Sequence, residues 1–86
     1  MTNEFIFNYI DEKMKENEDF IRYSYYELKI KNNLTEDEID KFLRINRDYF
    51  ENKGYKVYFT NARYEYNGAS QNVQANELMI AFKNNV

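Results

Sequence analysis

The stretch SYYELKIKNNLTEDEID, residues 24–40, contains two helix starts that lie eleven residues apart. In each, a hydroxyl side chain can accept a hydrogen bond from the backbone N–H of the residue three positions later. That residue is a glutamate, whose carboxylate can accept a hydrogen bond from the backbone N–H of the hydroxyl residue. The two pairs are Ser24 with Glu27 and Thr35 with Glu38. Two capping boxes with so short a connection predict a helix-turn-helix.

Apolar residues on either side of each start strengthen this prediction. Tyr23 and Leu28 flank the first capping box, and Leu34 and Ile39 flank the second, so each pair can pack as a hydrophobic staple. The first of the two helices is expected to end near residues 32–33, since asparagine tolerates a left-handed cap.

The helix that begins at Thr35 is expected to end at Gly54, which can adopt the positive φ of a helix stop. Its helical repeat predicts an inner face of Ile39, Phe42, Leu43, Asn46, Tyr49 and Phe50. An earlier helix is predicted to start after Thr2 or Asn3 and to run to about Asn17. It has an apolar stripe of Ile6, Ile10 and Met14, with Phe7 beside it.

After Gly54 the apolar residues alternate, which is typical of strands. Strands are expected at residues 55–60 and 78–83, a further arm at 62–66, a polar flap at 67–76 and a frayed tail at 83–86. The chain, residues 1–86, is therefore predicted to be a single α+β domain with three helices followed by an antiparallel β-hairpin, in a winged-helix-like order.

Composition argues against catalysis. The chain has no cysteine and no histidine, so the usual zinc ligands and the usual general base are missing. Its two serines have no histidine to activate them, and no glycine-rich phosphate loop is present. We expect a protein that is not an enzyme and has no cofactor and no metal. The absence of a signal-peptide pattern and of a long apolar run predicts a cytoplasmic protein without a membrane partner.

Two segments carry a resemblance to known proteins. The stretch YYELKIKNNLTEDEIDKFLRINRDYFENKGYKVYF, residues 25–59, followed by ARYEYNGASQNVQANELMIAF, residues 62–82, resembles small winged helix-turn-helix proteins. The segment from Gly54 onwards is also similar to short uncharacterised proteins of prophages and mobile elements of Gram-positive bacteria. This resemblance implies a phage or mobile-element accessory protein that acts on DNA transactions or transcription.

The candidate nucleic-acid site consists of Lys41, Arg44, Arg47, Lys56 and Arg63. Lys41, Arg44 and Arg47 form a stripe along one side of the third helix, and double-stranded DNA would be the partner. The alternative is a solvated helix face whose bases pair with Asp37, Asp40, Asp48 and Glu51. The first turn of this helix carries Glu36, Asp37 and Asp40, which would repel phosphates.

A second hypothesis is a protein-binding inhibitor of a host enzyme or defence factor. Two features favour it: the tyrosines, and an acidic first helix within residues 1–19, which carry six acids and two bases in a chain of net charge −3. Tyr58 is expected to point away from the apolar face of its strand, so at least one tyrosine is expected to be left for a partner. So many aromatics in a small chain also favour a homodimer, and a third hypothesis is an architectural role in a larger complex.

Overall fold

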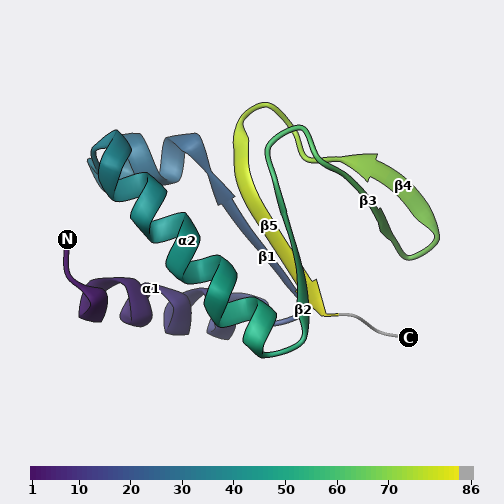
Figure 1. Cartoon of the computed structure of the whole chain (residues 1–86), viewed down its shortest axis with the longest axis horizontal. Helices are drawn as coiled ribbons and strands as arrows, with labels where there is room; N and C mark the ends of the chain where they lie inside the picture. Colours follow the sequence, from purple (N-terminus) through teal and green to yellow (C-terminus); the bar gives the residue numbers. More distant parts are fainter. Residues whose placement is uncertain (84–86) are drawn as a thin grey trace.

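The computed structural model describes residues 1–83, in which helices and antiparallel strands form an α+β fold (Figure 1). The elements are α1 (Asn3–Glu16), β1 (Phe20–Ser24), the π-helix η1 (Tyr26–Lys31), α2 (Glu36–Asn52), β2 (Tyr55–Phe59), β3 (Arg63–Tyr66), β4 (Ala69–Asn72) and β5 (Glu77–Lys83). β5 lies between β1 and β2 in an antiparallel sheet, and β3 pairs with β4 in a separate hairpin. The predicted α+β class is confirmed. Of the tail predicted to fray, Lys83 ends β5 and the remaining three residues lie outside the described part of the chain.

One strand interrupts the helices where the sequence predicts none. β1 lies between α1 and η1 and pairs with β5, so the predicted order of three helices before any strand is wrong at this point. The strand forms because Ile21 and Tyr23 are buried on one face while Arg22 between them is exposed, the alternation of a half-buried strand. The two predicted strands, β2 and β5, do pair with each other, but β1 joins them, so the sheet has three strands instead of two.

The helix starts lie where they are predicted, with one difference. Thr35 Oγ1 accepts a hydrogen bond from the Glu38 N–H at 3.2 Å, and Glu38 Oε1 accepts one from the Thr35 N–H at 2.9 Å, so the second capping box is complete. Ser24 Oγ accepts a hydrogen bond from the Glu27 N–H at 3.0 Å, but the Glu27 carboxylate turns towards α1. The first box is therefore half formed.

Residues with positive φ mark the ends of elements. Asn33, with φ 53°, follows η1 and Gly54, with φ 86°, follows α2, as predicted. Asn67 and Gly68, with φ 52° and 80°, make the turn between β3 and β4, and this pair of left-handed residues suits the twist of a hairpin. Part of the predicted polar flap is therefore a strand, because β4 lies within it.

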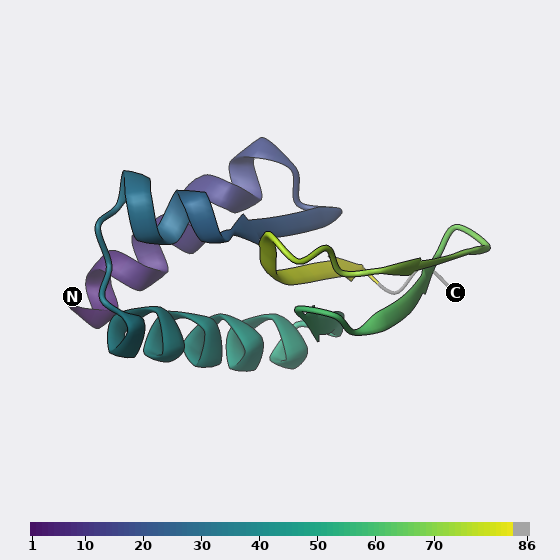
Figure 2. The same ribbon diagram turned by 90° about the horizontal axis from the view of Figure 1, so that it is seen from above.

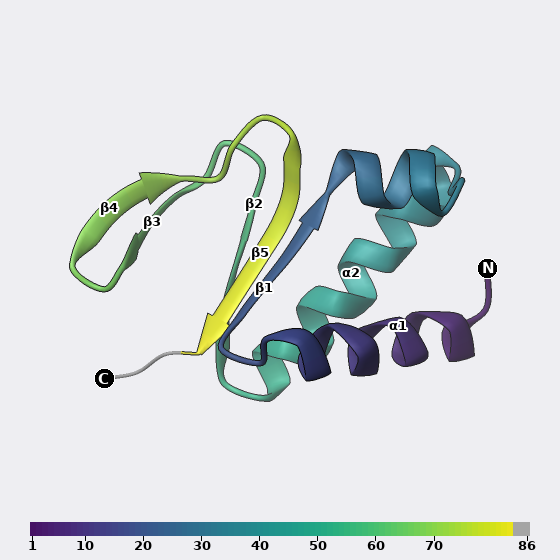
Figure 3. The ribbon, with the colours of Figure 1, turned by 180° about the vertical axis from the view of Figure 1, so that it is seen from behind.

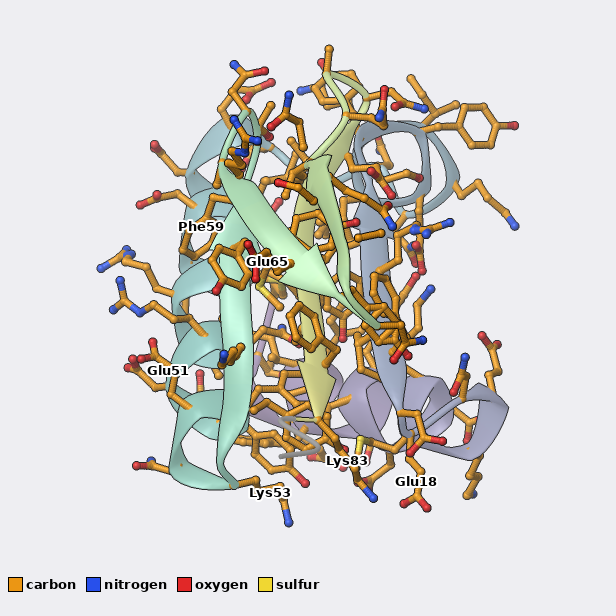
Figure 4. The ribbon with its side chains drawn as sticks, turned by 90° about the vertical axis from the view of Figure 1, so that its right-hand side faces the viewer. Glu18, Glu51, Lys53, Phe59, Glu65 and Lys83 are labelled. Carbon is orange, nitrogen blue, oxygen red and sulfur yellow. The ribbon has the colours of Figure 1, made fainter. Side chains whose placement is uncertain are left out.

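Helices cover one face of the three-stranded sheet, and the β3–β4 hairpin lies over the other (Figures 2 and 4). The buried core on the helix side includes Ile6, Ile10, Ile21, Tyr23, Leu28, Ile39, Phe42, Phe50 and Met79. The cluster on the hairpin side contains Tyr64, Val73, Ile80 and Phe82, with Phe20, Tyr58, Ala62 and Tyr66 packed against it. α1 crosses the C-terminal half of α2 (Figure 3), and the hairpin projects from the opposite end of the molecule to the start of α1 (Figures 1 and 2).

Candidate functional site

The predicted basic stripe of Lys41, Arg44 and Arg47 lies on the outer side of α2, where carboxylates of the same helix neutralise most of it. Arg44 Nη2 lies 3.2 Å from Asp40 Oδ2. Arg47 Nε lies 3.7 Å from Glu51 Oε1 and 3.2 Å from the carboxylate of its neighbour in the chain. Figure 4 shows Glu51 pointing away from the sheet. Lys41 has no ion pair within residues 1–83.

The other two predicted bases, Lys56 of β2 and Arg63 of β3, lie together. They line one open hollow of about 380 Å³ between the sheet and the hairpin, which also contains Glu65 and Ser70. Arg63 Nε donates a hydrogen bond to Ser70 Oγ at 2.8 Å. None of the stripe residues of α2 lines this hollow, so the structure divides the five predicted residues into two groups.

The aromatic rings on the outer face of the sheet are covered by the hairpin. Phe20 and Phe82 stack with ring centroids 5.8 Å apart, and Tyr58 stacks on Phe82 at 5.9 Å. Tyr64 and Tyr66 of the hairpin pack on these rings. Tyr58 is therefore half-buried against its own chain, and only part of its side chain is exposed.

A polar cluster that the sequence did not predict joins η1 to α1. The Glu27 carboxylate accepts a hydrogen bond from the Tyr9 hydroxyl and pairs with Lys13 Nζ at 2.8 Å. Asn32 Nδ2 donates to the Tyr9 hydroxyl at 3.1 Å. Burial and the Glu27 carboxylate raise the pKa of Tyr9. The sequence had placed Glu27 in the capping box, and only the fold brings α1 within its reach.

The outer side of the α1–α2 junction forms an apolar groove, which we call the Phe7 groove. Its lining residues are Phe7, Ile45, Asp48, Tyr49 and Asn52, around a hollow of about 310 Å³. Phe7 is 43% exposed, and its ring lies 6.1 Å from that of Tyr49. Glu4 and Asp11 flank Phe7 on α1, are exposed and have no ion pair within residues 1–83. The groove thus combines an exposed aromatic side chain with unneutralised acids.

A second exposed apolar surface lies on η1. Tyr25, Tyr26 and Ile30 are 41%, 62% and 59% exposed, while Leu28 on the other side of η1 is buried. Of the three tyrosines around the start of this helix, Tyr23, Tyr25 and Tyr26, only Tyr23 is buried in the core. The side chains of Lys29 and Lys31 lie on the same segment.

Comparison of the chain with protein-family models, with curated proteins and with solved structures finds no match in any of the three. Within residues 1–83 no helix has the length and apolar character needed to cross a membrane. In the same part of the chain no three acidic side chains lie close enough together to hold a metal ion.

Proposed function

We propose that the chain is a winged-helix-like domain that acts by binding another protein and catalyses no reaction. The element order α1, β1, η1, α2, β2, hairpin, β5 supports this assignment, as does the central place of β5 in the sheet. In such a domain α2 takes the position of the helix that reads DNA, and the β3–β4 hairpin is the wing. The lack of cysteine is in keeping with action in the cytoplasm.

The acidity of α2 is the observation that favours a protein over DNA as the partner. The helix contains six acidic and three basic side chains, which gives it a net charge of −3. Glu36 and Asp37 are exposed in its first turn, where a reading helix meets the bases and their flanking phosphates. Repulsion between these carboxylates and phosphates opposes groove docking.

The Phe7 groove is the docking surface that fits a protein partner best. Exposed aromatic side chains in a groove are typical anchors of protein interfaces. The acids beside Phe7 favour a partner that presents basic residues around an apolar side chain. In the setting of a phage or mobile element, such a partner would be a host enzyme or defence factor that the chain blocks.

Binding experiments with the host-cell lysate test this proposal. Proteins captured by the wild-type chain are purified and titrated against three variants. Phe7→Ala is expected to weaken binding at least about tenfold, because it removes the anchor, and Asp11→Asn should slow association and reduce its dependence on salt. The matched control is Tyr25→Ala, because Tyr25 is an aromatic outside the groove that is 41% exposed, against 43% for Phe7. A captured partner that binds Phe7→Ala and wild type equally well would show that the groove is not the docking surface.

Binding of double-stranded DNA is the second candidate function, and the hollow between the sheet and the hairpin favours it. Lys56 and Arg63 lie together there and have no ion pair within residues 1–83, so they are available for phosphates. Together with Lys41, Arg44 and Arg47 they would contact the DNA backbone without the first turn of α2 entering a groove. The salt dependence of DNA binding distinguishes this candidate from the first.

A further inference from the structure

We infer that the exposed face of η1 is a two-fold interface between two copies of this chain. This η1 face consists of Tyr25, Tyr26, Lys29, Ile30 and Lys31. It shares no residue with the Phe7 groove, so the inference goes beyond the proposed function and can fail or hold independently of it.

The geometry of η1 brings its apolar side chains together. In a π-helix the hydrogen bonds run between residues five apart, as in the bond from the Asn32 N–H to the Glu27 carbonyl at 3.2 Å. Ile30 therefore lies beside both Tyr25 and Tyr26. Of the four large apolar side chains that are exposed within residues 1–83, these are three. Aromatic and aliphatic side chains gathered in this way are typical of the centre of an interface.

Residues 1–83 do not cover the η1 face, because the polar cluster holds the opposite side of η1 against α1. Leu28 is fully buried, and Glu27 is held by Tyr9 and Lys13 of α1. Tyr26 and Ile30 consequently remain on the outside while the rest of η1 is anchored to α1.

Charges around the η1 face are self-complementary, which identifies the occupant as a second copy. Lys29 and Lys31 lie on η1, and the acidic first turn of α2 lies beside them, as shown by the ion pair of Lys29 Nζ with Glu36 Oε1 at 3.4 Å. Lys31 and Asp37 have no ion pair within residues 1–83. At a two-fold axis each contact occurs twice, so Lys31 of each copy can meet the acidic turn of the other. A uniformly acidic partner or an anionic membrane would pair with Lys31 but would leave Asp37 facing like charge.

The test is the mass of the full chain in solution, measured by sedimentation equilibrium from micromolar to submillimolar concentration. The wild type is expected to move from 10.6 kDa towards twice that mass as concentration rises. The double variant Tyr26→Glu, Ile30→Glu should remain monomeric throughout. Both positions are exposed, so its fold should persist, which circular dichroism and urea unfolding would verify. The control Phe7→Glu should dimerise like the wild type.

A charge exchange makes the inference specific. Lys31→Glu and Asp37→Lys should each weaken self-association at least about tenfold, because like charges then face each other in the pure dimers. An equimolar mixture of the two should restore a dimer, since both contacts become complementary again. A wild type that is monomeric at every concentration overturns the inference. So does a dimer that survives Tyr26→Glu with Ile30→Glu, or binding of anionic vesicles by these same residues in a monomeric chain.

Discussion

At the scale of single residues, Glu27 ties η1 to α1. The side chains of Glu27 and Lys13 are each 18% exposed and form an ion pair. The Glu27 carboxylate also accepts a hydrogen bond from the Tyr9 hydroxyl. Glu27→Gln would leave the ammonium of Lys13 without a counter-charge in a partly buried site. We expect a loss of about 2 kcal/mol in the free energy of unfolding, measured by urea titration.

Glu12→Gln is the matched control for this substitution. Glu12 pairs with Lys15 at 3.6 Å on the surface of α1, where the two side chains are 73% and 75% exposed. Exposed pairs contribute little, so the change should stay within about 0.5 kcal/mol. Equal effects of the two substitutions would show that the Glu27 cluster has no special part in stability.

One buried tyrosine, Tyr23, and one half-buried tyrosine, Tyr9, make stability sensitive to alkali. Burial raises the pKa of Tyr23 and of Tyr9 above the ordinary value near 10. The folded chain thus keeps these protons after the unfolded chain has lost them. Stability is fully present below about pH 10 and falls as the pH rises beyond it.

Tyr23→Phe tests this dependence on pH. The Tyr23 hydroxyl is buried without a hydrogen-bond partner among residues 1–83. Its removal should raise the free energy of unfolding at neutral pH by about 1 kcal/mol and should flatten the loss in alkali. Urea titrations at neutral pH and near pH 11 measure both effects. An alkaline loss as steep as that of the wild type would exclude Tyr23 as a source.

At the scale of elements, the complete capping box fixes the start of α2. Thr35→Ala removes the acceptor for the Glu38 N–H and should cost about 1 kcal/mol in urea unfolding, whereas Thr35→Ser should keep most of the stability. The Thr35 N–H and the amino terminus of Met1 also hold the pKa of Glu38 below its ordinary value. The stability that the Glu38 carboxylate contributes through these two contacts is therefore lost as the pH falls through the pKa of Glu38. A Thr35→Ser variant as unstable as Thr35→Ala would contradict the role of the hydroxyl.

Elements that depend on neighbours in the chain could be predicted from the sequence, and those that depend on distant partners could not. The start of α2 and the stops at Asn33 and Gly54 follow from caps and positive φ within a few residues. β1 forms because the last strand of the chain is there to pair with it. β4 has four exposed residues and no apolar alternation, so its turn and its partner β3 determine it.

The same distinction applies to the candidate site. Spacing along α2 predicted that Arg44 and Arg47 could pair with carboxylates one turn away, which the structure confirms. The meeting of Lys56 with Arg63 depends on how the hairpin folds over the sheet. Phe7 was expected beside the inner stripe of its helix, but the crossing of α1 over α2 leaves its ring partly exposed next to Tyr49.

At the scale of the whole molecule, the distribution of charge argues against DNA binding even though the element order resembles that of DNA-binding domains. The proposed winged-helix-like assignment rests on the element order, yet α2 and the chain as a whole are both net negative. Within residues 1–83 the large apolar side chains that remain exposed lie at the Phe7 groove and on the η1 face. Both have the character of protein interfaces, and a chain that uses them needs no contact with phosphates.

The most direct test of a protein-binding rather than DNA-binding role is a fluorescence titration of random duplex DNA with the full chain. It should be made at about 50 mM and about 150 mM salt, because phosphate contacts are strongest at low salt. If the chain acts on proteins, neither the wild type nor the variant Arg44→Ala, Arg47→Ala will bind at either concentration. Binding with a steep negative dependence on salt, reduced by that variant or by Lys56→Ala with Arg63→Ala, would contradict this role.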